Sequence, residues 1–135
     1  MVRIKAIYSG AKRCRAQHEP SGTFLETDAP KDNEGLGESF SPTDLLATAL
    51  GTCILTTIAI VAERDGVSVV NATMSVEKVM SAAPRKVESL KTIIELPKNT
   101  PLEYRSKIEI TGNNCPVRLS LHPDVRIPIE YRYTI

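Results

Sequence analysis

An uncharged, apolar segment over residues 45–62 limits what this chain can fold into more than any other feature. Just before it, Ser41 can cap a helix and Asp44 can close a capping box, with a proline at the first helical position. Gly66 follows as a helix stop. The sequence therefore predicts a helix over residues 41–65, and because this helix is apolar on nearly every face, it should be central to the fold.

The same segment approaches the length of a membrane span, which needs about 20 apolar residues. Its threonines add polar groups, no Trp or Tyr belt flanks it, and it begins like a helix in water. We therefore expect a core helix and no membrane contact. The chain starts without the apolar stretch and cleavage pattern of a secretory signal, so a cytoplasmic, reducing location is expected.

Alternating apolar and polar residues predict strands on both sides of this helix. In chain order we expect strands over residues 2–8, 13–19 and 22–27, a loop over 28–40, the helix 41–65, strands over 67–79 and 87–96, helices over 100–112 and 115–122, and a strand over 127–134. The order β-β-β-α-β-β-α-α-β indicates an α+β fold of antiparallel strands around a long central helix. Its 135 residues are the size of a single domain, residues 1–135.

Charge and aromatic content exclude some classes of partner. Seventeen basic and sixteen acidic residues leave a net charge of +1, whereas a nucleic-acid binder needs a strongly basic face. Two Phe, four Tyr and no Trp are too few for platforms that stack bases. We therefore expect no nucleic-acid partner.

Two cysteines are the candidates for chemistry. Cys53 lies inside the predicted central helix, and Cys115 lies at a predicted helix start before a proline. Unpaired N–H groups at a helix start favour a thiolate, so local electrostatics favour Cys115 as the reactive thiol. The alternatives are that Cys53 is a buried small hydrophobe and that Asn114 is the cap while Cys115 only fills space. If the two meet in space, they form a thiol redox pair.

The third cysteine gives weaker evidence for chemistry, and the possible metal ligands give little evidence for a site. Cys14 lies on a predicted strand between Arg13 and Arg15, which point to the opposite face, and a packing role fits it best. A zinc site would need scattered ligands without the paired spacing typical of zinc motifs, so no metal is expected.

Two motifs at this separation resemble the OsmC/Ohr family, most closely its OsmC-like branch. The motifs are Ser41-Pro42-Thr43-Asp44-Leu45-Leu46 with Leu50-Gly51-Thr52-Cys53, and Asn114-Cys115-Pro116-Val117. The resemblance implies an intertwined homodimer whose central helices pack across the interface. It also implies thiol-dependent reduction of organic hydroperoxides without a metal or organic cofactor.

The resemblance also assigns roles to single residues. Cys53 would be the peroxidatic nucleophile, in contrast to the local electrostatics, and Cys115 would resolve it as a disulfide that an external dithiol reduces. Arg13 or Arg15 would stabilise the thiolate. Family peroxidases often carry a glutamate where this chain has Thr43, so Asp44 is either its stand-in or only a helix cap. The alternative function is a non-enzymatic binding module or redox sensor with an apolar pocket at the dimer interface.

Overall fold

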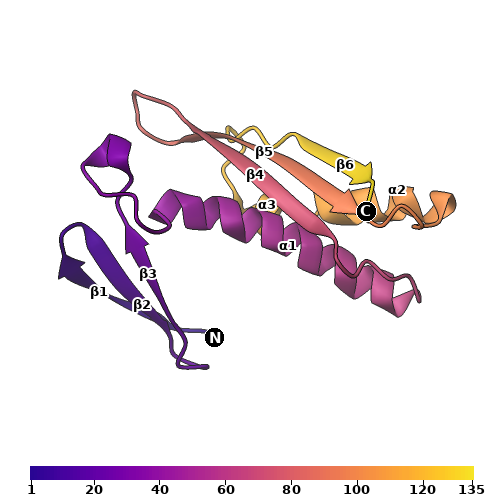
Figure 1. Cartoon of the computed structure of the whole chain (residues 1–135), viewed down its shortest axis with the longest axis horizontal. Coiled ribbons are helices and arrows are strands. Elements are labelled where there is room, and N and C mark those ends of the chain that lie inside the picture. The colour runs from indigo at the N-terminus through magenta and orange to yellow at the C-terminus, as the bar shows by residue number, and fades with distance from the viewer. The chain divides into compact units, whose positions relative to one another are not determined.

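The computed structural model describes residues Met1–Ile135 as two units, Met1–Leu46 and Ala47–Ile135. Each unit has its own three-stranded sheet (Figure 1). The observed elements follow the predicted order and confirm the α+β class, with one additional 3-10 turn at Lys31–Asn33. The single domain predicted over residues 1–135 stays a prediction.

The N-terminal unit is an antiparallel meander, as predicted. Its strands, in sheet order, are β1 (Ile4–Gly10), β2 (Arg13–His18) and β3 (Phe24–Asp28). Cross-strand pairs place Tyr8 beside Cys14, and Ala16 beside Leu25, on one face. This face is apolar but uncovered, because Ile4, Tyr8 and Leu25 are 59%, 64% and 45% exposed. Cys14 is half-buried on β2, and its packing role stays a prediction.

The loop after β3 is held by backbone hydrogen bonds. The Asp28 N–H donates to the Phe40 carbonyl at 3.0 Å, and the Gly37 N–H donates to the Ala29 carbonyl at 3.1 Å. A Cβ atom on Gly35 would lie 1.7 Å from the Ala29 carbonyl oxygen, so the loop closes only with glycine there. This closure leads the chain directly into the long helix.

The long helix α1 (Pro42–Arg64) begins and ends as the sequence predicts. The Ser41 N–H donates to Asp44 Oδ2 at 2.8 Å, and the Asp44 N–H donates to Ser41 Oγ at 3.1 Å, which is the predicted capping box. Gly66 takes a left-handed φ of 71° after the last turn, and the Val67 N–H donates to the Ala62 carbonyl at 2.9 Å.

Only one stripe of α1 is buried within this chain. The stripe consists of Ala47, Leu50, Gly51, Ile54, Ile58 and Ala62. Outside it, Ile60 is 46% exposed although it is apolar. By length and composition α1 could also cross a membrane, and 33% of its most apolar stretch is buried here. A single helix of this kind is weak evidence for a membrane protein, since core helices meet the same criteria.

The second sheet differs from the prediction in one pairing. Its strands, in sheet order, are β4 (Thr73–Met80), β5 (Val87–Leu96) and β6 (Ile129–Tyr133). β4 and β5 are antiparallel, but β6 runs parallel to β5, so the expectation of only antiparallel strands is wrong. The reason is the crossover through α2 (Leu102–Asn113) and α3 (Pro116–Ser120), which returns the chain to the same end of the sheet.

One row of side chains across this sheet faces the helices. Met74, Ile94 and Tyr131 pair in register on β4, β5 and β6. A Cβ atom on Gly51 of α1 would lie 2.5 Å from the Met74 sulfur, and one on Gly112 of α2 would lie 2.4 Å from the Tyr131 hydroxyl. Two glycines thus allow both helices to pack closely on this row.

Two local predictions are also wrong. β4 starts at Thr73, because residues 67–72 form a turn in which Asn71 has a φ of 71°. The capping box expected at residues 100–103 does not form, since the Thr100 hydroxyl donates instead to the Pro97 carbonyl at 2.7 Å. The helix α2 begins after Pro101 without a side-chain cap.

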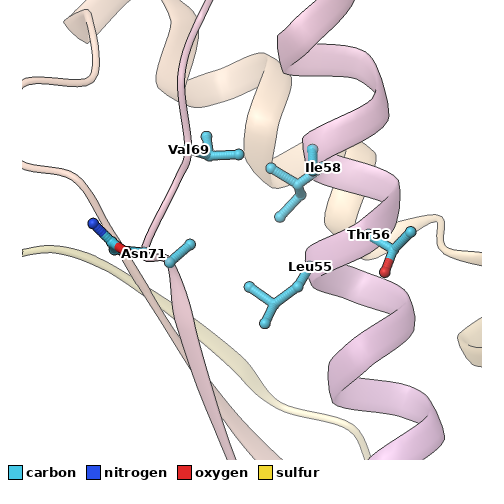
Figure 2. Close-up of a pocket in the computed structure, with 7 residues that line it drawn as sticks. Leu55, Thr56, Ile58, Val69 and Asn71 are labelled. Atoms are coloured by element: carbon cyan, nitrogen blue, oxygen red, sulfur yellow. The ribbon is translucent and has the colours of Figure 1, made fainter.

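The turn before β4 and the flank of α1 enclose a pocket of about 220 Å³. Figure 2 shows Leu55 and Ile58 of α1 pointing toward the segment that carries Val69 and Asn71. Its lining is mostly apolar, and neither Cys53 nor Cys115 belongs to it. This pocket is therefore separate from the thiol chemistry described below.

Candidate active site, a pair of thiols

Cys53 lies in the middle of α1 and is half-buried. Its sulfur lies 3.9 Å from the hydroxyl oxygen of Thr57, one helical turn further on. This hydroxyl can donate a hydrogen bond to a thiolate at Cys53. The central helix therefore presents a thiol that reagents can reach and places one polar side chain beside it.

Cys115 lies at the junction of α2 and α3 and is completely buried, with an exposed fraction of 0%. It is the N-cap residue of α3, followed by Pro116 in the first turn. Asn114 instead follows α2 as its C-cap, so the alternative in which Asn114 caps α3 is wrong. The fold thus carries the buried thiol on a short junction between two helices.

The structure brings the two thiols together. Both are free cysteines, and the side chain of Cys53 is an immediate electrostatic and hydrogen-bonding neighbour of Cys115. They come from elements separated in sequence by a complete sheet hairpin and a helix. The expected meeting of Cys53 and Cys115 is therefore found in the fold, while their catalytic roles stay predictions.

The pKa of Cys115 shifts against the direction that the sequence suggests. Burial raises the pKa of its thiol, and the neighbouring Cys53 raises it further. Backbone N–H groups of Arg118 and Val117 at the start of α3 lower the pKa of Cys115, but they do not overcome burial. The prediction of a favoured thiolate at Cys115 is therefore wrong, since a five-residue helix offers too little compensation.

This arrangement divides the work between two thiols. A reagent from solvent can reach the half-buried Cys53, whereas the buried Cys115 has Cys53 as its reaction partner. A thiol that is oxidised at Cys53 could be captured by Cys115 as a disulfide. The structure contains no group of three His, Cys, Asp or Glu side chains that could hold a metal ion.

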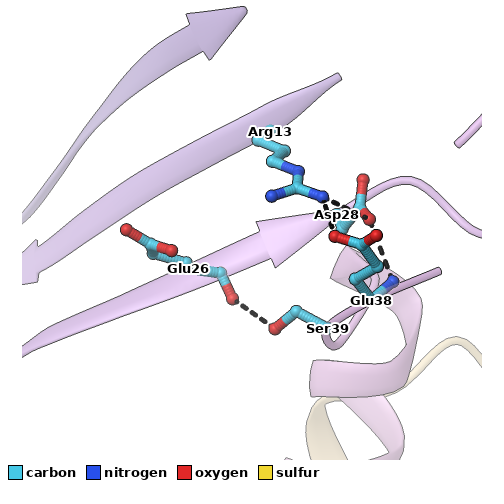
Figure 3. A network of polar contacts seen from close by, with 5 residues as sticks. All are labelled: Arg13, Glu26, Asp28, Glu38 and Ser39. Atoms are coloured by element: carbon cyan, nitrogen blue, oxygen red, sulfur yellow. Dashed lines mark hydrogen bonds and ion pairs between the residues drawn. The ribbon is translucent and has the colours of Figure 1, made fainter. Parts of the chain in front are cut away.

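Arg13 lies in the N-terminal unit within an acidic network (Figure 3). Its guanidinium group bonds the carboxylate of Glu38 and lies 3.6 Å from that of Asp28, which is 1% exposed. The hydrogen bond to Glu38 and the charge of Asp28 raise the pKa of Arg13. The structure thus gives Arg13 a role in fixing the loop after β3, and its action on Cys53 stays a prediction.

The other two predicted site residues also have local partners. Arg15 stacks its guanidinium carbon 4.0 Å from the ring centre of Phe24, a cation–π contact. Asp44 forms the capping box of α1 with Ser41. These partners give Arg15 and Asp44 local structural roles, and their roles in chemistry stay predictions.

Two further residues lie near the thiols. Thr57 lies four positions after Cys53, on the helix face that the sequence pattern predicts for both. Tyr131 comes from β6 and was missed, because only the fold places it close enough to Cys115 for the charge of that thiol to raise its pKa. Both side chains belong to the unit Ala47–Ile135.

Comparison with known proteins shows the family to which the chain is related. The sequence profile of a family described as OsmC-like protein matches residues 35–130. This range includes α1, the second sheet up to the start of β6, and both thiols. No curated protein sequence matches the chain.

Several solved structures are similar over nearly the whole chain. A protein from Psychrobacter arcticus 273-4, proposed to belong to the osmotic stress-induced and detoxification response, has 39% identity and a TM-score of 0.92, covering 98% of this chain and 96% of its own. The organic hydroperoxide resistance protein OsmC from Legionella pneumophila has 18% identity and a TM-score of 0.75, with 98% and 96% coverage. An OsmC-like protein from Mycoplasma pneumoniae has 19% identity and a TM-score of 0.80, with 97% and 95% coverage.

Proposed function

The chain belongs to the OsmC-like protein family, and we propose that it is a thiol-dependent peroxidase that reduces organic hydroperoxides. The observation that carries this proposal is the meeting of a reachable thiol on α1 with a buried thiol at the α2–α3 junction. Cys53 thiolate attacks the peroxide, releases the alcohol and becomes a sulfenic acid. Cys115 then forms a disulfide with release of water, and an external dithiol reduces this disulfide.

Consumption of cumene hydroperoxide with dithiothreitol as reductant tests this proposal. Cys53→Ser should abolish turnover, and Cys115→Ser should prevent formation of the intramolecular disulfide. Cys14→Ser is the matched control and should keep full activity, since Cys14 lies on the N-terminal sheet. Full activity of Cys53→Ser would contradict the proposal. Because most side chains of α1 are apolar, hydrogen peroxide should be a poorer substrate than an organic hydroperoxide.

We further propose that the protein works as a homodimer. The uncovered apolar face of the N-terminal sheet and the apolar side of α1 outside its buried stripe support this assembly. An obligate interface would bury more than about 2,000 Å² in total. A monomer at micromolar concentration in light scattering would contradict it.

A binding module or redox sensor is the second candidate function. The observation that favours it is the local use of Arg13 and Asp44, which hold a loop and cap a helix. If an arginine instead activates Cys53, Arg13→Ala or Arg15→Ala should slow alkylation of Cys53 at neutral pH about tenfold. Unchanged alkylation in both variants would favour the binding module or sensor.

A further inference from the structure

The hydroxyl group of Tyr131 contacts the last turn of α2. It donates toward the Glu109 carbonyl oxygen and toward Asn113 Oδ1, each at 3.4 Å. A Cβ atom on Gly112 would lie 2.4 Å from this hydroxyl, so the contact depends on glycine. Tyr131 therefore fixes the turn that leads directly to Cys115.

This turn is also connected to Cys115 by other hydrogen bonds. The Cys115 N–H donates to the Gly112 carbonyl at 3.4 Å, and Arg118 Nη1 donates to the Asn113 carbonyl at 2.7 Å. Asn113 is therefore held at two points: Tyr131 bonds its side-chain oxygen, and Arg118 bonds its main-chain carbonyl. A displacement of Asn113 would move the buried sulfur two residues later.

Tyr131 is suited to position a thiol rather than to transfer its proton. Burial raises the pKa of Tyr131 to about 12, and the nearby Cys115 raises it too. The phenol is therefore protonated at neutral pH and keeps its hydrogen-bond donor. It cannot serve as a base for the Cys115 thiol under these conditions.

We propose that Tyr131 is a positioning residue for disulfide closure, holding Cys115 in the place from which it reaches Cys53. This inference rests on the proposed function. In the step concerned, the Cys115 sulfur forms a bond with the Cys53 sulfur and the S–O bond of the sulfenic acid breaks. The leaving hydroxide combines with the proton of the Cys115 thiol and departs as water.

Tyr133 provides a matched control on the same strand and the same face. Its hydroxyl donates to Glu109 Oε1 at 3.1 Å and toward the Arg105 carbonyl at 3.4 Å. These contacts also tie β6 to α2, but they lie further from Cys115 along the helix. Tyr133→Phe should therefore lose comparable hydrogen bonds without releasing Asn113.

The first measurement is a single turnover with one equivalent of cumene hydroperoxide, in which dimedone traps the sulfenic acid and mass spectrometry follows it. In Tyr131→Phe the sulfenic acid should persist about tenfold longer, while its rate of formation is unchanged. Asn113→Ala removes the same hydrogen bond and should reproduce this effect. Tyr133→Phe should behave like the wild type. Equal sulfenic acid lifetimes in Tyr131→Phe and the wild type would overturn the inference.

The second measurement needs no peroxide and separates this inference from the proposed function. The proteins are equilibrated in buffers of oxidised and reduced dithiothreitol, and the Cys53–Cys115 disulfide is quantified. Tyr131→Phe should need about a tenfold higher ratio of oxidised to reduced reagent for half-formation. If this shift occurs but the wild type consumes no peroxide, the peroxidase proposal fails and the positioning role stands. If Tyr131→Phe and Asn113→Ala leave the ratio unchanged, the positioning role is wrong.

Discussion

The two sheets of this protein differ in how far their apolar side chains are buried. In the second sheet, Leu90, Ile94 and Leu96 of β5 are fully buried at 0% exposure. In the N-terminal sheet, Ile4, Tyr8 and Leu25 share one face and remain about half exposed or more, at 59%, 64% and 45%. One unit thus carries its own core, whereas the other carries an apolar face without one.

The contrast extends to the polar groups. The C-terminal unit contains the thiol pair and the tyrosines that contact α2. Its reactive and hydrogen-bonding side chains therefore lie in the unit that has a packed core. The N-terminal unit is organised by charges, with Asp28 buried between Arg13 and the loop. The core-bearing unit should therefore determine stability, and the exposed sheet should determine assembly.

The largest expected effect is the loss of a core side chain from the second sheet. Ile94→Ala should lower the free energy of unfolding by about 4 kcal/mol, because it leaves a cavity among fully buried neighbours. Ile7→Ala on β1 should cost less than about 1 kcal/mol, since Ile7 is 67% exposed on the opposite face from Leu25. Urea unfolding measures both, and equal losses would remove the distinction between the two sheets.

The next effect concerns assembly through the N-terminal sheet. Leu25→Lys should weaken the proposed homodimer about a hundredfold, or about 3 kcal/mol, because it places a charge on the apolar face. Glu26→Gln changes the net charge by the same amount but lies on the other face, and it should leave assembly intact. Sedimentation equilibrium compares the two variants. Unaltered association of Leu25→Lys would exclude this face from the interface.

Alkaline pH should weaken the C-terminal unit through Tyr131. Burial raises the pKa of Tyr131 from 10.0 to about 12, so the native state keeps a proton that the unfolded chain releases. The stabilisation that comes from protonated Tyr131 is therefore complete below pH 10. As the pH rises toward 12, the free energy of unfolding should fall by about 2 kcal/mol. Urea titrations across this range should show a smaller loss for Tyr131→Phe than for the wild type. Identical pH dependences would disprove this linkage.

The smallest effect is expected at the helix cap that leads from one unit to the other. Asp44→Asn should lower the free energy of unfolding by about 1 kcal/mol, because the Ser41 N–H loses its charged acceptor. If Asp44 is only a cap, peroxide turnover for each folded molecule stays unchanged. A loss of turnover without a change in melting temperature would instead identify Asp44 as the stand-in for the family glutamate.

Local rules predicted the parts of the fold that depend on neighbours in sequence. The capping box of Ser41 and Asp44, the stop at Gly66 and the meander of β1–β3 were all predictable. The parallel pairing of β6 was not predictable, because the sequence of a strand that follows two helices does not indicate whether it runs parallel or antiparallel to its neighbour. The same rules failed at Thr100, whose hydroxyl bonds backward to Pro97.

The candidate site shows a similar division. The positions of Cys53 and Cys115 inside or at the start of predicted helices singled them out as candidates, and the family resemblance added their roles. The direction of the Cys115 pKa shift could not be read from its helix start, since burial depends on the complete fold and outweighs nearby N–H groups. Tyr131 was missed for the same reason, because its contacts with α2 and its closeness to Cys115 depend on the complete fold.

Complete burial of Cys115 also determines how a closed disulfide would be opened again. An incoming dithiol must attack the sulfur that it can reach, which is that of Cys53, so Cys115 becomes the leaving group. A thiol with a raised pKa is a poor leaving group. The burial that raises the pKa of Cys115 therefore slows its release from the disulfide. Weak monothiols should recycle this protein poorly, and its reductant is expected to be a strong dithiol that approaches α1 closely.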